Sequence, residues 1–163
     1  MRPDFWPDST TKGIFSFRMN KQKFSIRQAS WQQDRAALQG IREVVFVQEQ
    51  KVPRELEWDK QDRTAYHFLA EDENGNPIGT ARLLDDGQIG RMAVLKPWRS
   101  SGVGSALLAT VLTHLSSSGC PKPFLNAQTR AVPFYQRHGF QIKGDVFLEA
   151  AIPHLRMEFT AHE

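Results

Sequence analysis

The sequence predicts an α+β domain in which one mixed central β-sheet is flanked by helices. Three runs rich in strand-forming residues follow one another directly, at residues 65–71, 78–84 and 88–95. Helical patterns lie before and after this group and do not alternate with each strand, which argues against a strict βαβ order. A chain of 163 residues is long enough for one domain with a full core. We therefore expect a single domain over residues 23–163.

The segments before the three strands predict an extension, a strand and a helix. Residues 1–22 contain turn formers without sustained periodicity, so we interpret them as an N-terminal extension that orders only against the domain or a partner. Residues 24–27 alternate apolar and polar side chains, which indicates a short strand. Ser30 followed by Gln33 is typical of a helix start, and apolar residues then recur on one helical face. The predicted helix covers residues 31–47.

The middle of the chain predicts a loop region followed by a β-meander. Residues 47–63 interleave acidic with basic residues and are interrupted by Pro53, so we expect a short helix and a loop there. The three strands that follow are separated by Asn74-Gly75 and by residues 85–87, which read Asp-Asp-Gly. Turn sequences of this kind supply positive φ angles and join antiparallel neighbours.

The C-terminal half predicts two helices and the strands that complete the sheet. Residues 103–115 keep the apolar spacing of a buried helix face, and Gly119 provides a stop. Residues 124–127 fit a short inner strand. A helix over residues 131–138 tolerates Pro133 because this proline falls in its first turn. Residues 140–142, 145–149 and 155–159 supply the closing strands.

Composition argues against several classes of function. The net charge is +3, but basic and acidic residues alternate and no dense basic stripe is present, so no nucleic-acid partner is expected. No apolar run approaches the length of about 20 residues that a membrane helix needs, so no membrane partner is expected. The N-terminal residues lack the pattern of a secretory signal, and Cys120 is the single cysteine, which together favour the reducing cytoplasm.

A short glycine-containing loop, residues 99–105, precedes the second long helix. Such a loop concentrates free backbone N–H groups and the positive end of the helix dipole, which favours a phosphate or pyrophosphate ligand. A P-loop requires a lysine after its last glycine, where this sequence has Ser105. A dinucleotide-binding fingerprint requires a third glycine where Leu107 stands. Both nucleotide sites are therefore excluded.

The loop sequence RSSGVG resembles the Q/R-x-x-G-x-G/A signature of the GNAT superfamily, the GCN5-related N-acetyltransferases that bind acetyl-CoA. The segment PFYQRHGF resembles the Y-x-x-x-G-F element of the same family. Within it, the segments VFVQEQ, HFLAE, GRMAV, NAQ and IPHLRM look most like the bacterial subgroup described as ElaA-like or YjcF-like. The resemblance covers residues 24–159 and implies the GNAT acyl-CoA N-acyltransferase fold, with the sheet splayed at its fourth strand.

The resemblance also implies a coenzyme site, with which the physical properties of the loop agree. Backbone amides of residues 101–105 can surround a pyrophosphate, and the two glycines permit its close approach. In the family, main-chain groups of the strand before the loop pair with the pantetheine arm. The expected contacts of the coenzyme are Met92, Ala93, Val94, Arg99, Ser100, Ser101, Gly102, Val103, Gly104, Ser105 and Gln128.

Tyr135 occupies the position of the family's catalytic acid. Attack of an amine on a thioester expels a thiolate, and a positioned phenol can donate a proton to that thiolate. A backbone N–H of residues 92–94 is the expected donor to the oxyanion. The alternative is that Tyr135 only packs its ring in the core and hydrogen-bonds a neighbour.

The sequence leaves the general base open. Some relatives place a glutamate in the fifth strand, where this chain has the segment FLNA. Glu49 and Glu57 are the candidate bases, with Asp59 and His67 as further candidates that would also bind substrate. The alternative for the acids is that they form a solvated face or pair with nearby arginines. The alternative for His67 and His154 is that they are packed, hydrogen-bonded histidines and not bases.

Two arginines of the central strands, Arg82 and Arg91, are further candidates for substrate binding. An unpaired charge on a central strand would be costly, so these side chains either line the acceptor pocket or pair with a loop acid such as Glu57 or Asp59.

Together these features predict transfer of an acetyl group from acetyl-CoA to a primary amine of a small molecule or peptide. No serine or cysteine nucleophile site and no metal-ligand spacing is recognisable, so direct attack in a ternary complex without a metal is expected. The alternative function is a catalytically silent GNAT-like module that binds acyl-CoA as a sensor or interaction partner. Dimers are common in the family, so a homodimer is an expected assembly.

Overall fold

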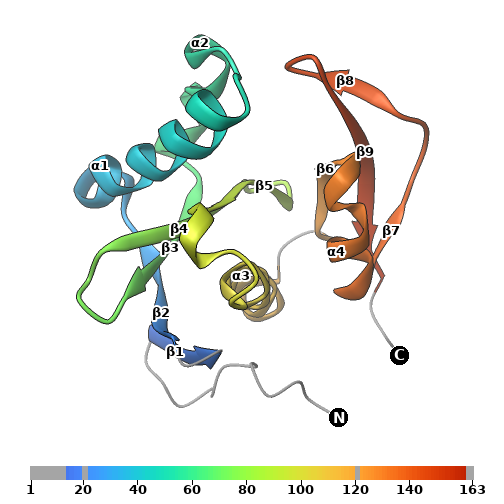
Figure 1. Ribbon diagram of the computed structural model, residues 1–163. Coiled ribbons are helices and arrows are strands. Elements are labelled where there is room, and N and C mark those ends of the chain that lie inside the picture. Colours follow the sequence, from blue (N-terminus) through green and yellow to red (C-terminus); the bar gives the residue numbers. More distant parts are fainter. Residues whose placement is uncertain (1–13, 20–21, 120–121, 161–163) are drawn as a thin grey trace.

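The computed structural model describes residues 14–19, 22–119 and 122–160, and they form one mixed β-sheet with helices on both faces (Figure 1). The strand order is β1-β2-β3-β4-β5-β6-β9-β7, and β8 pairs with β9. All neighbouring strands are antiparallel except β5 and β6, which are parallel. The strands are β1 (Ile14–Met19), β2 (Gln22–Ala29), β3 (Tyr66–Asp72), β4 (Pro77–Leu83), β5 (Gln88–Val94), β6 (Phe124–Gln128), β7 (Phe140–Ile142), β8 (Phe147–Glu149) and β9 (Ile152–Phe159).

The strand β1 lies inside the segment that the sequence predicted to be an extension without regular structure. It pairs antiparallel with β2, in a register that runs from Ile14 opposite Arg27 to Met19 opposite Gln22. This part of the segment is therefore ordered against the domain. Residues 1–13 of the predicted extension lie outside the described residues.

The helices match the predicted positions, with one difference in winding. Helix α1 (Trp31–Arg42) starts at Ser30, whose hydroxyl accepts a hydrogen bond from the Gln33 amide at 3.4 Å. The predicted helix continues beyond α1 but winds as a π-helix, η1 (Glu43–Glu49). The other helical segments are α2 (Arg54–Glu57), η2 (Lys60–Arg63), η3 (Lys96–Trp98), α3 (Val103–Ser118), η4 (Thr129–Ala131) and α4 (Val132–Arg137). No helix of the described residues is long and apolar enough to cross a membrane.

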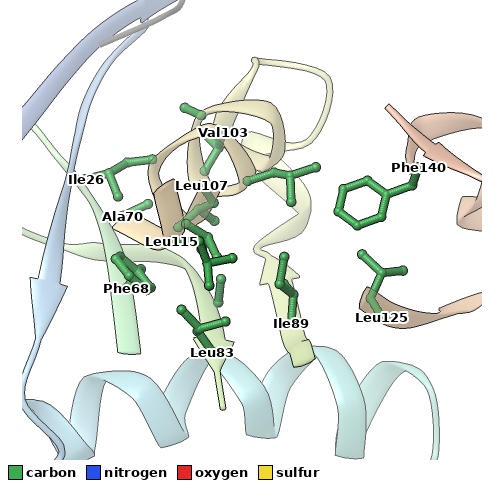
Figure 2. Close-up of a cluster of buried hydrophobic side chains, with 14 of the residues drawn as sticks. Ile26, Phe68, Ala70, Leu83, Ile89, Val103, Leu107, Leu115, Leu125 and Phe140 are labelled. Atoms are coloured by element: carbon green, nitrogen blue, oxygen red, sulfur yellow. The ribbon is translucent and has the colours of Figure 1, made fainter. Parts of the chain in front are cut away.

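Buried apolar side chains cover both faces of the central strands. Phe68 belongs to the cluster that packs against α3, whereas Leu69 packs with Leu38 and Ile41 of α1 on the opposite face. Alternating side chains of a strand point to opposite faces, so the nearly continuous apolar runs of the sequence fit a sheet covered on both sides. The α3 cluster in Figure 2 includes Ile26, Phe68, Leu83, Ile89, Leu107, Leu115, Leu125 and Phe140.

The sheet opens between β5 and β6. The two strands pair only at their first residues, with Gln88 opposite Phe124 and Ile89 opposite Leu125. A register shift interrupts β5 opposite Ala81, and Arg91 there has a φ of 49°, which is uncommon for a residue with a side chain. Residues 90–94 of β5 therefore have no strand partner on the side of β6. Counted from β2, β5 is the fourth strand, so the predicted splay at the fourth strand is confirmed.

Gly79 allows α3 to pack closely on β4, and Gly79→Ala is expected to lower the free energy of unfolding by about 1–2 kcal/mol. An added Cβ would lie 3.2 Å from Ala93 O, Leu107 Cδ1 and Val103 Cγ1. Urea unfolding followed by circular dichroism measures the effect. Gly40→Ala is the matched control, because no atom lies within 4 Å of its Cβ in α1, and it should raise stability by about 0.5–1 kcal/mol. Equal midpoints for Gly79→Ala and wild type would contradict this packing argument.

Candidate active site

A cavity of ≈ 1050 Å³ lies where β5 and β6 separate. Its walls come from η1, the segment of residues 56–61, β5, β6, α4 and the turn between β8 and β9. In Figure 1, α2 and the β8–β9 turn face each other above β5. The predicted site residues that line it are Glu49, Glu57, Asp59, Arg82, Arg91, Met92, Ala93, Val94, Arg99, Gln128 and Tyr135. Eleven predicted side chains or main-chain positions thus meet at one place, although they come from distant parts of the sequence.

The loop of residues 100–105 continues from Arg99 at the edge of this cavity into α3. Gly102 is the N-cap of α3 with a φ of 88°, and no side chain caps this helix end. The first backbone N–H groups of a helix have no partner within the helix, so Val103 and Gly104 present donors at the positive end of a 16-residue helix. The side chain of Ser105 has a partner elsewhere, because its hydroxyl lies 3.1 Å from His138 Nε2. The loop has the donor chemistry that a pyrophosphate requires.

Arg99 connects the loop to two walls of the cavity. Its Nε donates to the Val94 carbonyl at 2.9 Å, and its Nη2 donates to both carboxylate oxygens of Glu49 at 2.9 and 3.0 Å. The predicted coenzyme contact Arg99 and the predicted base Glu49 are therefore ion-pair partners. This pair fixes the C-terminal end of η1 against the end of β5.

Tyr135 projects from α4 towards the free edge of β5. Its hydroxyl donates to Met92 Sδ at a distance of 3.6 Å, and its ring packs edge-on against Phe134 and Phe140. Burial raises the pKa of Tyr135 to about 12, so the phenol stays protonated at neutral pH. The ring of Tyr135 packs against its aromatic neighbours, as expected if the residue had only a structural role. Tyr135 also lines the cavity, and its hydroxyl carries a proton.

A largely buried charge network lies at the cavity wall that residues 56–61 form, and four of its members line the cavity. It consists of six side chains, Arg42, Glu57, Asp59, Asp62, Arg82 and Arg91. Arg42 lies at its centre, where its Nε donates to Glu57 at 2.7 Å and its Nη1 donates to Asp62 at 2.8 Å. Arg42 and Asp62 are each 1% exposed, so these charges depend on one another and not on water.

The two strand arginines complete this network. Arg82 Nη1 donates to Asp59 at 2.8 Å and to Asp62 at 3.1 Å. Arg91 Nη2 donates to Asp59 at 3.2 Å, and Arg91 Nε lies 3.2 Å from Glu57 Oε1. The predicted alternative, in which Arg82 and Arg91 pair with Glu57 or Asp59, is confirmed. Both arginines also line the cavity, so pairing and lining are not exclusive.

Burial and pairing have opposite effects on the acids of this network. Burial raises the pKa of Asp62, but hydrogen bonds and charges of Arg42 and Arg82 outweigh it, and the net pKa is lowered. For Glu57, burial prevails over the attraction of Arg91 and Arg42, and the net pKa is raised. Glu57 is 3% exposed, so its carboxylate acts first as a structural partner.

His67 does not join the other predicted substrate contacts. It is 1% exposed and does not line the cavity. Its Nε2 lies 2.8 Å from the Asp62 carbonyl, and its ring stacks on Trp31 with centroids 5.0 Å apart. Burial lowers the pKa of His67, which keeps the ring neutral. The packed alternative describes His67, because β3 directs it to the face covered by α1.

Gln128 lies at the end of β6, and its side chain contacts Gln50, the residue that follows η1. Its Nε2 donates to Gln50 Oε1 at 2.7 Å, and its Oε1 accepts a hydrogen bond from Arg130 Nε at 3.1 Å. Gln128 thus bridges β6 and the residue after η1, next to the free edge of β5.

Sequence reasoning missed Arg42, Asp62 and Glu149, and it favoured a packed role for His154. Arg42 and Asp62 hold the charge network, and Glu149 and His154 line the cavity from the β8–β9 side. Arg42 falls on the apolar face of the predicted helix, where a lone arginine indicates a buried acid partner. No local pattern identifies Glu149, because only the pairing of β8 with β9 brings it to the cavity and beside His154.

Asp62→Asn is expected to lower the free energy of unfolding by about 3 kcal/mol at pH 7, because Arg42 then keeps a buried charge with half of its partners. The folded-state pKa of Asp62 is lowered, so its contribution is complete above about pH 5 and is lost as the pH falls below about 4. Urea titrations at several pH values test both statements. Glu43→Gln removes an exposed pair with Arg54 and should change stability little. A variant with the wild-type acid dependence would contradict the assigned role of Asp62.

Comparisons with known proteins agree with this geometry. The family model described as an acetyltransferase (GNAT) domain matches residues 30–161. The uncharacterized N-acetyltransferase YjcF of Bacillus subtilis is 40% identical over 121 residues, which are 72% of this chain and 86% of that protein. This supports the YjcF-like resemblance inferred from the sequence segments.

Solved structures show the same fold. Escherichia coli ElaA matches with a TM-score of 0.74 and 28% identity, over 83% of this chain and 99% of that chain. A structure titled acyl-CoA N-acyltransferase from Pseudomonas aeruginosa matches with a TM-score of 0.72 and 29% identity, over 85% of this chain and 99% of that chain. The splayed sheet, the uncapped start of α3 and these matches lead to one conclusion: the chain belongs to the GNAT acetyltransferase family, with ElaA-like and YjcF-like resemblance, and its fold implies the use of an acyl-CoA.

Proposed function

We propose that the protein transfers an acetyl group from acetyl-CoA to a primary amine of a small molecule or peptide, by direct attack in a ternary complex. One observation carries this proposal. The Tyr135 hydroxyl lies 3.6 Å from Met92 Sδ, at the free edge of β5 and inside the cavity that the splay opens. A protonated donor therefore lies beside the side chain of Met92, a residue of the strand along which the family binds its thioester.

Two features of the chain fit an acyl-CoA. The uncapped first turn of α3, with Ser100, Ser101 and Gly102 leading into it, would hold the pyrophosphate through backbone amides. Main-chain groups of Met92, Ala93 and Val94 that face the side of β6 would pair with the amides of the pantetheine arm as a neighbouring strand does, in addition to the bond that the Val94 carbonyl accepts from Arg99. Arg99 and Gln128 would contribute side-chain contacts at the two sides of this path.

The reaction generates negative charge on two atoms, the carbonyl oxygen and the sulfur of the thioester, and each requires a hydrogen-bond or proton donor. The amine nitrogen attacks the thioester carbonyl, and a backbone N–H on the free edge of β5 stabilises the resulting oxyanion. The C–S bond breaks as the intermediate collapses, and Tyr135 donates its proton to the sulfur. The proposal places this reaction in the cytoplasm, in agreement with the single cysteine of the chain.

The second candidate function is a GNAT-like module that binds acyl-CoA without catalysis. One observation favours it, because β6 has the sequence FLNAQ and offers no carboxylate at the position where some relatives place their base. Binding of acetyl-CoA without turnover of any amine would identify this function.

Gly104→Asp should abolish binding of acetyl-CoA while leaving the fold intact. A Cβ at Gly104 meets Phe134 at 3.5 Å, which is an ordinary contact, and a carboxylate in the first turn of α3 is favourable for the helix. The same carboxylate repels a pyrophosphate. The thermal shift on adding acetyl-CoA should therefore disappear in Gly104→Asp and persist in the uncharged control Gly104→Asn. Equal shifts in both variants would place the pyrophosphate elsewhere.

Tyr135→Phe should reduce kcat by about 10²-fold or more with an accepted amine, since the proton donor is lost and the ring is kept. The measurement is CoA release with a panel of polyamines, amino acids and short lysine peptides, run in parallel for wild type and variant. The KM for acetyl-CoA should change little. Turnover at the wild-type rate by Tyr135→Phe would remove this residue from the mechanism, and absence of turnover by wild type with the whole panel would favour the binding module.

A further inference from the structure

The β8–β9 hairpin places two titratable side chains on the cavity wall that the mechanism above does not use. Glu149 ends β8, and His154 lies near the start of β9. Glu149 Oε2 and His154 Nε2 are 3.5 Å apart, and both residues line the cavity. The cavity thus contains a carboxylate and an imidazole side by side.

The connection between the two strands is strained. The two turn residues Ala150 and Ala151 have φ angles of 51° and 61°, and the turn places Glu149 opposite Ile152. Residues with a side chain pay about 1–2 kcal/mol each for such angles, and glycine or asparagine normally occupies these positions. Strain of this kind persists where the surrounding structure or function requires the conformation. Here the tight turn is what sets Glu149 beside His154.

Hydrogen bonding fixes the proton of the neutral His154 ring. Its Nδ1 lies 2.6 Å from the Ile152 carbonyl oxygen. A carbonyl oxygen can only accept, so Nδ1 carries the hydrogen and Nε2 carries the lone pair. The ring also stacks on Phe147 with centroids 5.9 Å apart, which holds its plane. Nε2, the basic nitrogen, is the one directed towards Glu149.

Glu149 differs from the other carboxylates of the cavity. Glu49 pairs with Arg99, Asp59 pairs with Arg82 and Arg91, and Glu57 pairs with buried arginines. Within the described part of the chain, the basic side chain near Glu149 is that of His154 alone, which forms an ion pair with it only when the ring is protonated, and the Glu149 side chain is 50% exposed. It is therefore the carboxylate of the cavity that is available to an ammonium group from solution.

The two earlier base candidates are less suited to accept a proton. Protonation of Glu57 would leave Arg42 and Arg91 without the carboxylate that both contact, at a high electrostatic cost. Protonation of Glu49 would remove the charge that pairs with Arg99 and weaken their hydrogen bonds. His154 Nε2 has no comparable bond to lose.

We propose that Glu149 and His154 form the acceptor-amine site, in which the Glu149 carboxylate attracts the ammonium group and His154 Nε2 removes its proton as the general base. This inference rests on the proposed function and adds the position of the acceptor. It also explains why β6 needs no glutamate, because the base comes from β9, the neighbour of β6 in the sheet.

The proton balance of this reaction closes. The ammonium group gives one proton to His154, which releases it to solvent after the reaction. The neutral nitrogen forms a C–N bond with the acetyl carbon, and the C–S bond breaks. The second proton leaves the nitrogen as the amide forms, while Tyr135 supplies a proton to the sulfur and is reprotonated from water. One proton is released for each acetyl group transferred.

The neighbourhood of His154 contains few other charged groups. From β6, the residue opposite it is the neutral Gln128, and from β8 the opposite residue is Phe147. Arg156 is the nearest charged residue on the same face of β9, and its guanidinium lies over the Phe124 ring while its Nε donates to Glu158. Among the described residues, Glu149 is thus the charged group in contact with His154.

The test compares His154→Asn with wild type across pH 6–9.5, using the best amine of the panel. Asparagine keeps a donor for the Ile152 carbonyl but has no nitrogen at the position of Nε2. We expect kcat at pH 7 to fall by about 10²-fold, with the KM for acetyl-CoA unchanged. The loss should shrink at high pH, where the free amine needs no base. Imidazole added to His154→Ala should restore part of the rate, which a purely structural role of His154 would not allow.

A variant of Glu149 tests the role of the carboxylate, and a variant of His114 serves as the control. Glu149→Gln should raise the KM for the amine by about tenfold and leave the KM for acetyl-CoA unchanged, because it removes the charge that attracts the ammonium group. His114→Asn alters a histidine packed between Tyr66 and Phe68, outside the cavity lining, and should keep the wild-type kcat. Melting temperatures identify variants that fail to fold. If His154→Asn is one of them, the imidazole rescue of His154→Ala replaces the comparison of His154→Asn with wild type.

The outcomes distinguish this inference from the proposed function. A wild type that acetylates an amine under control of Tyr135, with a wild-type kcat in His154→Asn at every pH, overturns the acceptor site and leaves the proposed function intact. A pH-independent loss without imidazole rescue assigns His154 a structural role and also overturns the base. A wild type without turnover on the whole panel overturns both.

Discussion

The separation of β5 from β6 is the constraint on which the rest of the site depends. The two strands pair at two residues each, and beyond Ile89 the main chain of β5 has no partner towards β6. Unpaired main-chain groups of a buried strand are costly, so a fold retains them where a ligand takes the place of the missing strand. The bulge lies at Arg91, and α3 begins after η3 and the loop that follows it, with no side-chain cap at its first turn. The proposed coenzyme path, the position of Tyr135 and the proposed acceptor cavity all depend on this one divergence.

The charge network holds residues 54–63 at the side of the opening. Residues 54–63 have few apolar side chains to bury, and Leu56 among them is 55% exposed. Their position is held by Glu57, Asp59 and Asp62, which pair with arginines of α1, β4 and β5. Ion pairs suit the cavity wall at residues 54–63. Apolar side chains there would pack together and fill the cavity, whereas paired charges keep a defined geometry in contact with water. Pairing offsets part of the energetic cost of burying these groups, since Arg82 Nε and Arg91 Nε remain buried without a hydrogen-bond partner among the described residues.

Most elements of the fold could be predicted from sequence, because hydrophobic periodicity and turn residues are local signals. The strand β1 could not, since its order comes from pairing with β2. The π-helical winding of η1 was also missed, because a helical period does not distinguish it from α1. In the site, the loop of residues 99–105 and Tyr135 have recognisable motifs. Arg42, Asp62, Glu149 and His154 acquire their roles from contacts between residues distant in sequence, which no local pattern encodes.

Hydrogen exchange along β5 tests the central claim most directly. The amides of residues 90–94 are compared without ligand and with saturating acetyl-CoA, and those of β3, which has strand partners on both sides, serve as the internal reference. If the pantetheine arm takes the place of the missing strand, exchange at residues 90–94 should slow by about tenfold or more while β3 stays unchanged. Bound acetyl-CoA with unchanged exchange along β5 would contradict the account, because the free edge would then not be the binding surface.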